Sequence, residues 1–220
     1  MVLKRRIVLL GPPASGKGTQ AHLLSTHFNI PTASTGAMLR HEIADGTAIG
    51  LEASQYTNDG GFVPDELVLR IVSAWMDKHE NGFILDGFPR TLSQAEALEK
   101  DLVKRQRSLD IAFLFNLSDK EIHERVTNRL TCDACGATFG EQLHSLKEKS
   151  VCPHCGGVLT HRKDDTEATL VNRLAIYQEK TLPIANFYRE RGILNECDGS
   201  VAPEILFEKL SNALKGVASV

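Results

Sequence analysis

The sequence predicts an α/β protein in which a parallel five-stranded sheet carries helices on both faces. Short apolar runs alternate along the chain with helical patterns, and this alternation is typical of a parallel sheet. The apolar runs lie at residues 6–10, 30–34, 82–86, 111–115 and 193–197. A glycine-rich loop directly follows the first run. Strand, loop and helix in this order indicate a phosphate-binding site.

The composition is that of a globular protein and argues against several function classes. Of the 220 residues, 42% are hydrophobic and 24% are charged, so the chain can bury the core of one main domain. A net charge of −3 argues against a nucleic-acid-binding surface, because neutralising phosphates needs clustered Lys and Arg. The first apolar run is too short for a signal peptide, and no stretch is long enough to span a membrane. We expect a cytoplasmic monomer that binds neither nucleic acid nor membranes.

The loop after the first apolar run supplies the strongest local signal. It consists of Gly11, Pro12, Pro13, Ala14, Ser15, Gly16, Lys17, Gly18 and Thr19. The glycines let backbone N–H groups point inward, and the following helix adds the positive end of its dipole. Lys17 would place a full charge on the phosphates. The match to G-x-x-x-x-G-K-[ST] is imperfect, because Gly18 stands where Ser or Thr is expected and Thr19 follows one position later.

A second group of polar residues follows the third apolar run. Asp86 ends this run, and Gly87-Phe88-Pro89-Arg90 comes directly after it. Ligands of open parallel sheets bind at the carboxyl ends of the strands, so Asp86 and Arg90 fall at the expected site. A carboxylate there can hold magnesium, directly or through its waters. An aspartate that merely ends a strand in a turn is the alternative interpretation.

Four of the five cysteines form two pairs. Cys132-x-x-Cys135 and Cys152-x-x-Cys155 are separated by 16 residues, a spacing that fits a structural zinc site with four thiolate ligands. Two disulfides are the alternative, which a reducing compartment disfavours. The fifth, Cys197, lies in the last apolar run, and we expect it to be a buried, inert thiol.

Arginines recur in the second half of the chain. The pattern Ser118-x-x-Glu121 predicts a capped helix that carries Arg125 and Arg129, which would share one helical face. The helical pattern resumes after residue 165, carries Arg173, and breaks near Pro183.

Together these motifs resemble the adenylate kinase family, specifically the members whose lid carries four metal ligands. The resemblance covers nearly the whole chain in the right order. It rests on residues 11–20, Ser34-Thr35-Gly36 with Arg40, Pro64-Asp65-Glu66, residues 86–91, the two cysteine pairs, and Arg162-Lys163-Asp164-Asp165. Gly-Lys-Gly-Thr is this family's form of the loop. The chain departs from the family at Ala14, where glycine is usual, and at Gly61, where members often carry lysine.

The resemblance implies a nucleoside monophosphate kinase that transfers a phosphoryl group from MgATP to AMP and yields two ADP. It implies a P-loop NTPase-like core over 1–33, 64–130 and 162–220. A helical monophosphate-binding insertion is implied over 34–63, and a small zinc-ribbon-like lid over 131–161. The phosphate of AMP is already an anionic nucleophile, so the protein needs no general base. It must supply positioning and positive charge.

The resemblance also implies roles for individual residues. ATP would be bound by residues 11–19 with Arg129, Thr138 and Phe139. AMP would be bound by Thr35, Arg40, Gly61, Phe62, Val63, Gly87, Phe88, Pro89, Arg90, Gln94, Arg162 and Arg173. The implied catalytic residues are Lys17, Arg90, Arg125, Arg129, Arg162, Arg173, Asp164 and Asp165. Thr19 and Asp86 would hold magnesium through waters, and Cys132, Cys135, Cys152 and Cys155 would hold zinc.

Three other functions stay open at this point. The cysteine segment could be a nucleic-acid-binding or regulatory zinc ribbon fused to a phosphate-binding domain, although the acidic net charge argues against it. The acceptor could be another nucleoside monophosphate. Gln94 favours AMP, because its amide can pair with both a donor and an acceptor on the adenine edge. The donor could be GTP instead of ATP.

Overall fold

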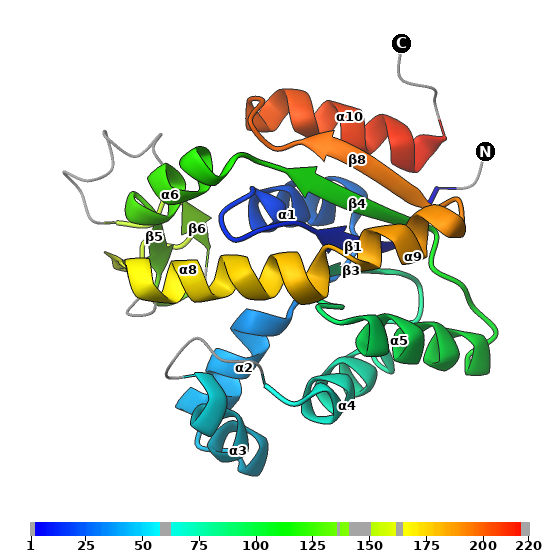
Figure 1. Cartoon of the computed structure of the whole chain (residues 1–220), viewed down its shortest axis with the longest axis horizontal. Coiled ribbons are helices and arrows are strands. Elements are labelled where there is room, and N and C mark those ends of the chain that lie inside the picture. The colour runs from blue at the N-terminus through cyan, green and yellow to red at the C-terminus, as the bar shows by residue number, and fades with distance from the viewer. Residues whose placement is uncertain (1–2, 58–62, 136, 141–150, 162–164, 217–220) are drawn as a thin grey trace.

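A five-stranded parallel sheet forms the centre of the molecule, as the sequence predicts (Figure 1). The computed structural model describes residues 3–57, 63–135, 137–140, 151–161 and 165–216 of the chain. The strands are β1 (Arg6–Leu10), β2 (Thr32–Ser34), β3 (Phe83–Asp86), β4 (Ile111–Asn116) and β8 (Leu194–Asp198). Their order is β2-β3-β1-β4-β8, and every neighbouring pair is parallel. The loop that follows β1 therefore leaves the middle of the sheet, at the edge where β3 and β4 also end.

Helices cover both faces of this sheet. They are α1 (Lys17–Phe28), α2 (Thr35–Ala44), α3 (Ala48–Thr57), α4 (Asp65–Met76), α5 (Leu92–Lys104), α6 (Asp119–Thr127), α8 (Glu167–Ile176), α9 (Ile184–Glu190) and α10 (Pro203–Lys215). Side chains of β1 alternate between the faces. Val8 and Leu10 pack in a cluster with α4, α5 and α9, whereas Ile7 and Leu9 pack with α1 and α10. A strand that is buried on both sides needs a continuous apolar run, which is why residues 6–10 could be recognised.

Local capping fixes where several helices begin. Ser118 and Glu121 form the expected capping box at the start of α6, and Thr91 accepts a hydrogen bond from the Gln94 N–H at the start of α5. The expected break near Pro183 is also present. Tyr177–Thr181 (η2) is a π-helical turn, and Pro183 precedes α9.

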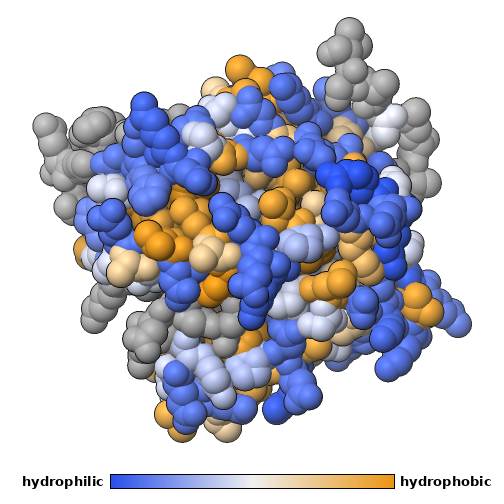
Figure 2. All heavy atoms as spheres, viewed as in Figure 1, coloured by the Kyte–Doolittle hydropathy of each residue, from blue (hydrophilic) through white to orange (hydrophobic). Residues whose placement is uncertain are grey.

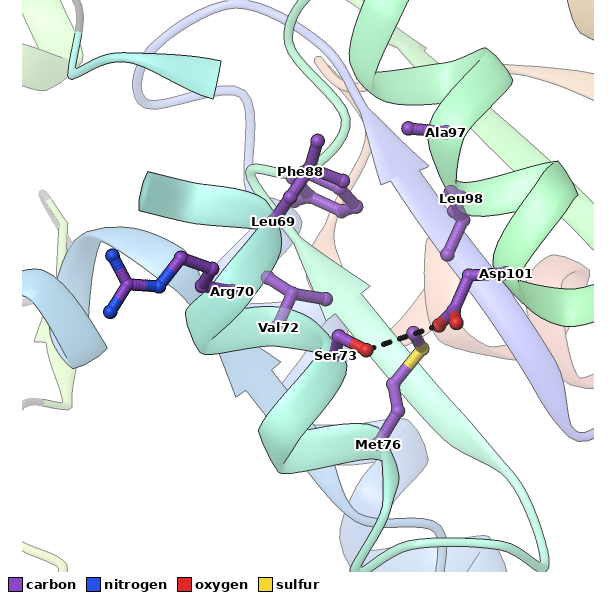
Figure 3. Close-up of a pocket in the computed structure, with 9 residues that line it drawn as sticks. All are labelled: Leu69, Arg70, Val72, Ser73, Met76, Phe88, Ala97, Leu98 and Asp101. Atoms are coloured by element: carbon purple, nitrogen blue, oxygen red, sulfur yellow. Dashed lines mark hydrogen bonds between the residues drawn. The ribbon is translucent and has the colours of Figure 1, made fainter. Parts of the chain in front are cut away.

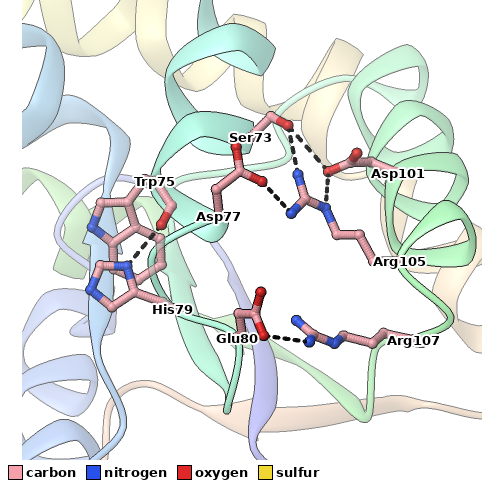
Figure 4. A network of polar contacts seen from close by, with 8 residues as sticks. All are labelled: Ser73, Trp75, Asp77, His79, Glu80, Asp101, Arg105 and Arg107. Atoms are coloured by element: carbon pink, nitrogen blue, oxygen red, sulfur yellow. Dashed lines mark hydrogen bonds and ion pairs between the residues drawn. The ribbon is translucent and has the colours of Figure 1, made fainter.

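Helices α4 and α5 are joined by a polar network at their carboxyl-terminal ends (Figure 4). The Arg105 guanidinium donates to Asp101 at 2.9 Å and to Ser73 at 3.0 Å, and it also pairs with Asp77. This network holds the two helices in a fixed relation. Their opposite, amino-terminal ends lie beside the polar loop that follows β3.

The segment after α6 forms a second, smaller sheet. Its antiparallel strands are β5 (Leu130–Cys132), β6 (Thr138–Phe139) and β7 (Leu159–Thr160), in the order β6-β5-β7. Leu130, Cys132, Cys152 and Leu159 form its buried cluster, and Phe139 packs against them. In Figure 1 this sheet lies beside α6, at one end of the molecule.

One sequence prediction about this segment is wrong. Arg125 and Arg129 do not share a helix, because α6 ends at Thr127 and Arg129 directly precedes β5. The chain leaves the helix to bring Leu130 into the small sheet, where that side chain is buried. Arg129 is then held by a carboxylate from another segment rather than by its helix.

The surface is ordinary for a globular protein. Large exposed apolar side chains such as Leu51, Val103 and Ile205 are spread over separate helices. Hydrophilic side chains predominate on the face shown in Figure 2. Within the described ranges, no helix is both long and apolar enough to cross a bilayer.

Candidate functional site

The loop between β1 and α1 curls around the ammonium group of Lys17. Lys17 Nζ donates hydrogen bonds to the carbonyl oxygens of Gly11 at 2.9 Å and of Pro12 at 2.7 Å. It also donates to Ser15 Oγ at 3.2 Å. Gly11 has no room for a side chain, because a Cβ there would lie 2.8 Å from Ser15 Oγ. The loop is thus a tight backbone cradle with a cation at its rim.

The electrostatic surroundings of Lys17 are unfavourable to its own charge. Burial lowers the pKa of Lys17 to about 8, Asp86 opposes this shift, and the positive charges of Arg90 and Arg129 add to it. A lysine whose charged form is disfavoured gains stabilisation when an anion arrives. The position therefore suits a phosphate group.

Ala14, the departure from the family pattern within this loop, has a left-handed backbone with φ of 57°. Such a backbone costs an alanine roughly 1 kcal/mol. Its side chain packs against a cluster formed by Ile122, Val126 and Leu170. This apolar contact offsets part of the cost of the left-handed backbone. The loop still encloses the Lys17 ammonium group.

Asp86 lies close to the end of the loop. Its Oδ2 atom is 3.6 Å from the place that a Cβ on Gly18 would occupy. Thr19 follows Gly18, is exposed, and lines the same cleft as Asp86. A carboxylate and a hydroxyl oxygen together fit a hard cation such as Mg²⁺, which keeps several of its waters when bound.

A second set of polar groups meets at Gly87. Thr35 Oγ1 and Arg90 Nε both donate to the Gly87 carbonyl oxygen, at 2.9 and 2.8 Å. The Arg40 guanidinium lies over the start of α2, where its Nη1 is 3.3 Å from a Cβ position on Gly36. Thr35, Arg40 and Arg90 come from two different segments and line one wall of the cleft.

Arg90 carries positive charge into a cationic environment. The walls of the cleft desolvate Arg90 and lower its pKa, Asp86 opposes the shift, and Arg173 and Arg40 lower the pKa further. Several cations that disfavour one another at short range form a region of positive potential. A polyphosphate would relieve this repulsion.

Asp165 connects two of the arginines. It forms a two-pronged ion pair with Arg129, in which the distance from Arg129 Nε to Asp165 Oδ2 is 2.8 Å. Arg173 Nη1 lies 3.4 Å from Asp165 Oδ1. The Asp165 side chain is 2% exposed, so its charge is compensated by these guanidinium groups rather than by water.

The four paired cysteines meet at one point in the small sheet. Their sulfur atoms all lie within 4.8 Å of one another. Two of the sulfur–sulfur distances are 3.5 Å for Cys132–Cys155 and 3.7 Å for Cys135–Cys152. Tetrahedral zinc with Zn–S bonds of about 2.3 Å requires sulfur atoms about 3.8 Å apart. The four sulfur atoms therefore fit a zinc ion. They are too far apart for disulfides, in which the S–S bond is about 2.05 Å long.

The backbone favours the thiolate form of Cys132, whereas desolvation and the neighbouring thiols raise the pKa of Cys135 to about 12. The N–H groups of Cys135 and Ala134 donate to the Cys132 sulfur and lower the pKa of this thiol to about 7. A Cβ on Gly157 would lie 2.9 Å from the same sulfur, so glycine is required there. Outside the cluster, Cys197 is half-buried in β8, and burial raises the pKa of its thiol to about 12, as expected for an inert thiol.

The small sheet contacts helix α1 through aromatic rings. His154, between the last two cysteines, stacks on His22 of α1 with ring centroids 4.7 Å apart. Phe139 meets the same His154 ring edge-on at 5.2 Å. These contacts bring the small sheet over the helix that begins at the phosphate-binding loop.

Most of these groups line one cleft of about 2150 Å³. Sites for one drug-sized ligand are commonly about 300–1,000 Å³, so this cleft has room for two nucleotides. The sequence-predicted residues on its walls are Gly11, Pro13, Ala14, Ser15, Gly16, Lys17, Gly18, Thr19, Thr35, Arg40, Val63, Asp86, Gly87, Pro89, Arg90, Gln94, Arg125, Arg129, Cys132, Cys135, Thr138, Phe139, Cys155 and Arg173.

Four described residues named from the sequence are not on the walls of this cleft: Pro12, Phe88, Cys152 and Asp165. Phe88 is fully buried and faces a different cavity. Pro12 is buried and contributes its carbonyl group to Lys17. Gly61, Phe62, Arg162 and Asp164 lie outside the described residues, so their predicted roles stay predictions.

Sequence reasoning missed three participants. His22 and His154 contact each other from segments far apart in the chain, and no spacing rule signals such a pair. Thr181, in the π-helical turn, donates to the Arg90 carbonyl oxygen at 2.9 Å. The π-helical turn was itself not predicted, although Pro183 marks its end.

A smaller cavity of about 290 Å³ lies between α4 and α5 (Figure 3). Leu69, Val72, Met76, Phe88 and Leu98 make its walls mostly apolar. Polar groups do not converge on it as they do on the large cleft. We therefore place the candidate site in the large cleft.

A parallel α/β sheet with a glycine-rich loop after its central strand defines a P-loop-like nucleotide-binding protein. Residues 9–193 match the family model described as adenylate kinase (ADK). The chain is 44% identical to the adenylate kinase of Clostridium botulinum (strain Hall) over 211 residues, which covers 95% of this chain and 98% of the relative. It is 42% identical to that of Clostridium tetani (strain Massachusetts) over 213 residues, covering 96% and 99%. The chain belongs to the adenylate kinase family.

Proposed function

We propose that the protein transfers the terminal phosphoryl group of MgATP to AMP, reversibly, and yields two ADP. The observation that carries this proposal is the convergence of cations from separate segments on one cleft large enough for two nucleotides. Lys17, Arg90, Arg129 and Arg173 all line it. Positioning and charge stabilisation are the main requirements of phosphoryl transfer, and no separate base is needed when the nucleophile is a phosphate.

On the donor side, residues 11–19 would cradle the ATP phosphates with their backbone N–H groups. Lys17 would exchange its bonds to the loop carbonyls for bonds to phosphate oxygens. Arg125 and Arg129 would hold the triphosphate from the opposite wall, and Thr138 with Phe139 would flank the base.

On the acceptor side, Thr35, Arg40, the backbone at 61–63, residues 87–90 and Gln94 would bind AMP. Thr35 and Arg90 meet at Gly87, and Arg40 lies beside Gly36 on the same wall, which supports an anion site there. Arg162 and Arg173 would clamp the phosphates between the two nucleotides. Asp164 and Asp165 would balance these charges, as Asp165 already does for Arg129 and Arg173.

Two metal ions complete the proposal. Thr19 and Asp86 would hold Mg²⁺ through waters, where it would neutralise charge on the phosphates. Cys132, Cys135, Cys152 and Cys155 would hold a structural Zn²⁺. The described part of the small sheet buries only a few apolar side chains, so a metal is the natural source of its stability.

Residues 131–161 would act as a lid that closes over ATP, and residues 34–63 as the acceptor-binding insertion. An open site would let water compete with AMP for the phosphoryl group. We further propose that the protein is a monomer and that it is located in the cytoplasm. Its free thiols fit a reducing compartment.

A coupled assay of ADP formation over a panel of donors and acceptors tests this function. Rapid turnover with ATP and AMP is the expected result. Preference for GTP as donor, or for another monophosphate as acceptor, would redirect the proposal within the kinase class. Absence of turnover together with tight binding of single-stranded nucleic acid would favour a nucleic-acid-binding module.

Lys17→Met separates an effect on catalysis from an effect on folding, when turnover in this assay is compared with the thermal midpoint. Turnover should fall by about 100-fold or more, as when a charge aimed at the transition state is removed. The thermal midpoint should change little. Lys104→Met, which removes an exposed lysine at the end of α5, is the matched control and should leave turnover intact.

A further inference from the structure

Gln94 is held by the protein on two sides. The Arg90 backbone N–H donates to Gln94 Oε1 at 2.7 Å, and Gln94 Nε2 donates to Asp65 Oδ1 at 2.6 Å. The side chain is 1% exposed and lies on the wall of the large cleft. Asp65, the first residue of α4, does not line that cleft and was given no role by the sequence.

These two contacts fix which way the amide points. If the amide were flipped, Nε2 would face the Arg90 N–H, and two donors would oppose each other. Oε1 would then face the Asp65 carboxylate, and two acceptors would oppose each other. Both ends of the amide therefore resist rotation, because a buried donor or acceptor that faces another of its own kind is destabilised.

The fixed amide retains part of its hydrogen-bonding capacity. A side-chain amide can accept two hydrogen bonds at oxygen and donate two from nitrogen. Arg90 and Asp65 use one of each. Among the described residues nothing else bonds the amide, which leaves one acceptor site at Oε1 and one donor site at Nε2, and their positions are set by Arg90 and Asp65.

The fixed positions of the Gln94 oxygen and nitrogen determine which base of the acceptor nucleotide can pair with the amide. Adenine presents a 6-amino donor beside an unprotonated ring nitrogen, whereas a 6-oxopurine presents an acceptor beside a ring N–H. An amide free to rotate would pair with either base. An amide with fixed polarity pairs with only one of them.

Asp65 is itself anchored, so its hold on Gln94 is firm. Its Oδ2 accepts hydrogen bonds from Thr91 Oγ1 at 2.7 Å and from Ser93 Oγ. Thr91 also caps α5 by accepting from the Gln94 N–H at 3.1 Å. The carboxylate thus lies against the amino terminus of α5, where the helix dipole favours negative charge. The network at the far ends of α4 and α5 keeps the two helices in register (Figure 4).

We propose that Asp65 is a positioning residue for acceptor specificity. By fixing the orientation of the Gln94 amide, it lets the protein distinguish a 6-aminopurine monophosphate from a 6-oxopurine monophosphate. The inference rests on the proposed function, in which Gln94 faces the base of the acceptor.

The test compares AMP with IMP as acceptors. These nucleotides differ at the 6-position and at the protonation of the neighbouring ring nitrogen. In Asp65→Ala the ratio of kcat/KM for AMP to that for IMP should fall by at least about 10-fold, because the freed amide can turn toward either base. The KM for ATP should stay unchanged, which a general structural defect would not allow.

Two further variants sharpen the result. Asp65→Asn can still offer an oxygen to Gln94 Nε2 and should restore most of the AMP-to-IMP ratio. Glu66→Ala removes the same charge from the neighbouring, exposed position and should leave the ratio unchanged. If Asp65→Ala does not fold, Asp65→Ser keeps a polar group at the start of α4 but is too short to reach Gln94, and it carries the same expectation.

The outcomes separate the two claims. If the unmodified protein does not phosphorylate AMP, the proposed function fails. If it does, and Gln94→Leu abolishes the preference for AMP while the Asp65 variant keeps it, only the positioning role of Asp65 is overturned. A preference that survives in both variants would place base recognition in backbone groups, which also overturns the inference.

Discussion

The central sheet and the small sheet of the lid segment are stabilised by different forces. The central sheet is enclosed by apolar clusters on both faces, with side chains such as Leu9, Leu85 and Phe113 almost completely buried. In the described part of the lid segment, the buried cluster is limited to Leu130, Cys132, Cys152 and Leu159. Half of that small cluster consists of cysteines whose sulfur atoms converge on one point.

This difference suits the tasks we assign to the two regions. A platform that must hold Lys17, Asp86 and Arg90 in fixed positions benefits from a close-packed core. A lid that must move as a body can take its rigidity from a metal and keep few contacts with the rest of the chain. Its described contacts include the His154–His22 stack, and Arg129 at its base pairs with Asp165.

Breaking the core of the central sheet should have the largest effect. Phe113→Ala removes a fully buried ring of β4 that packs in one cluster with α1 and α10, and the free energy of unfolding should fall by about 3–5 kcal/mol. Urea titration followed by circular dichroism measures this loss. A change below about 1 kcal/mol would mean that the sheet is not the main source of stability.

Breaking the metal site should affect the lid and leave the sheet folded. Cys152→Ser should release zinc and slow ADP formation by at least about 10-fold, with little change in the urea midpoint. Metal analysis and the coupled assay measure both effects. Cys197→Ser makes the same chemical change in β8 and should keep both zinc and activity. Full activity in zinc-free protein would contradict the claim that the lid depends on the metal.

The pH dependence of catalysis reports on Lys17 at the start of α1. Its pKa of about 8 in the free protein is below the ordinary lysine value, so the charged form is lost as pH rises through 8. The kcat/KM for MgATP should therefore fall above pH 8, while kcat stays flatter because bound phosphates favour the charged lysine. Lys17→Arg keeps its charge and should abolish this decline, whatever its absolute rate. An identical profile in both proteins would assign the decline to another group.

Removing the contact between the lid segment and α1 should change the measured parameters least. His154→Ala removes a ring contact worth about 0.5–1.5 kcal/mol, so the KM for ATP should rise about 2- to 10-fold while the KM for AMP stays constant. His79→Ala removes a comparable stack on Trp75, away from the lid, and should change neither KM. Equal changes in both KM values would argue against a contact that serves the donor side alone.

Much of the fold could be predicted because its signals are local. The strands of the central sheet are apolar runs buried on both faces, and Ser118 and Thr91 mark helix starts through bonds that span three residues. The phosphate loop and the cysteine pairs are equally compact in sequence. Physical rules that act over a few residues are enough to find them.

The remaining features depend on contacts between distant segments. Arg129 leaves its predicted helix because Leu130 must enter the small sheet and Asp165 offers a partner. The Asp65–Gln94 bond joins the start of α4 to α5, and only the packing of these helices makes it possible. No local pattern encodes either contact, so sequence reasoning could not place them.

Hydrogen exchange of the zinc-loaded and chelator-treated protein tests the central distinction between the two regions most directly. Removing the metal should speed amide exchange at 130–132, 138–139 and 151–160, and leave β1, β3 and β4 protected as before. Parallel loss of protection in β4 would contradict the account, because it would show that the central sheet and the lid segment unfold as one cooperative unit.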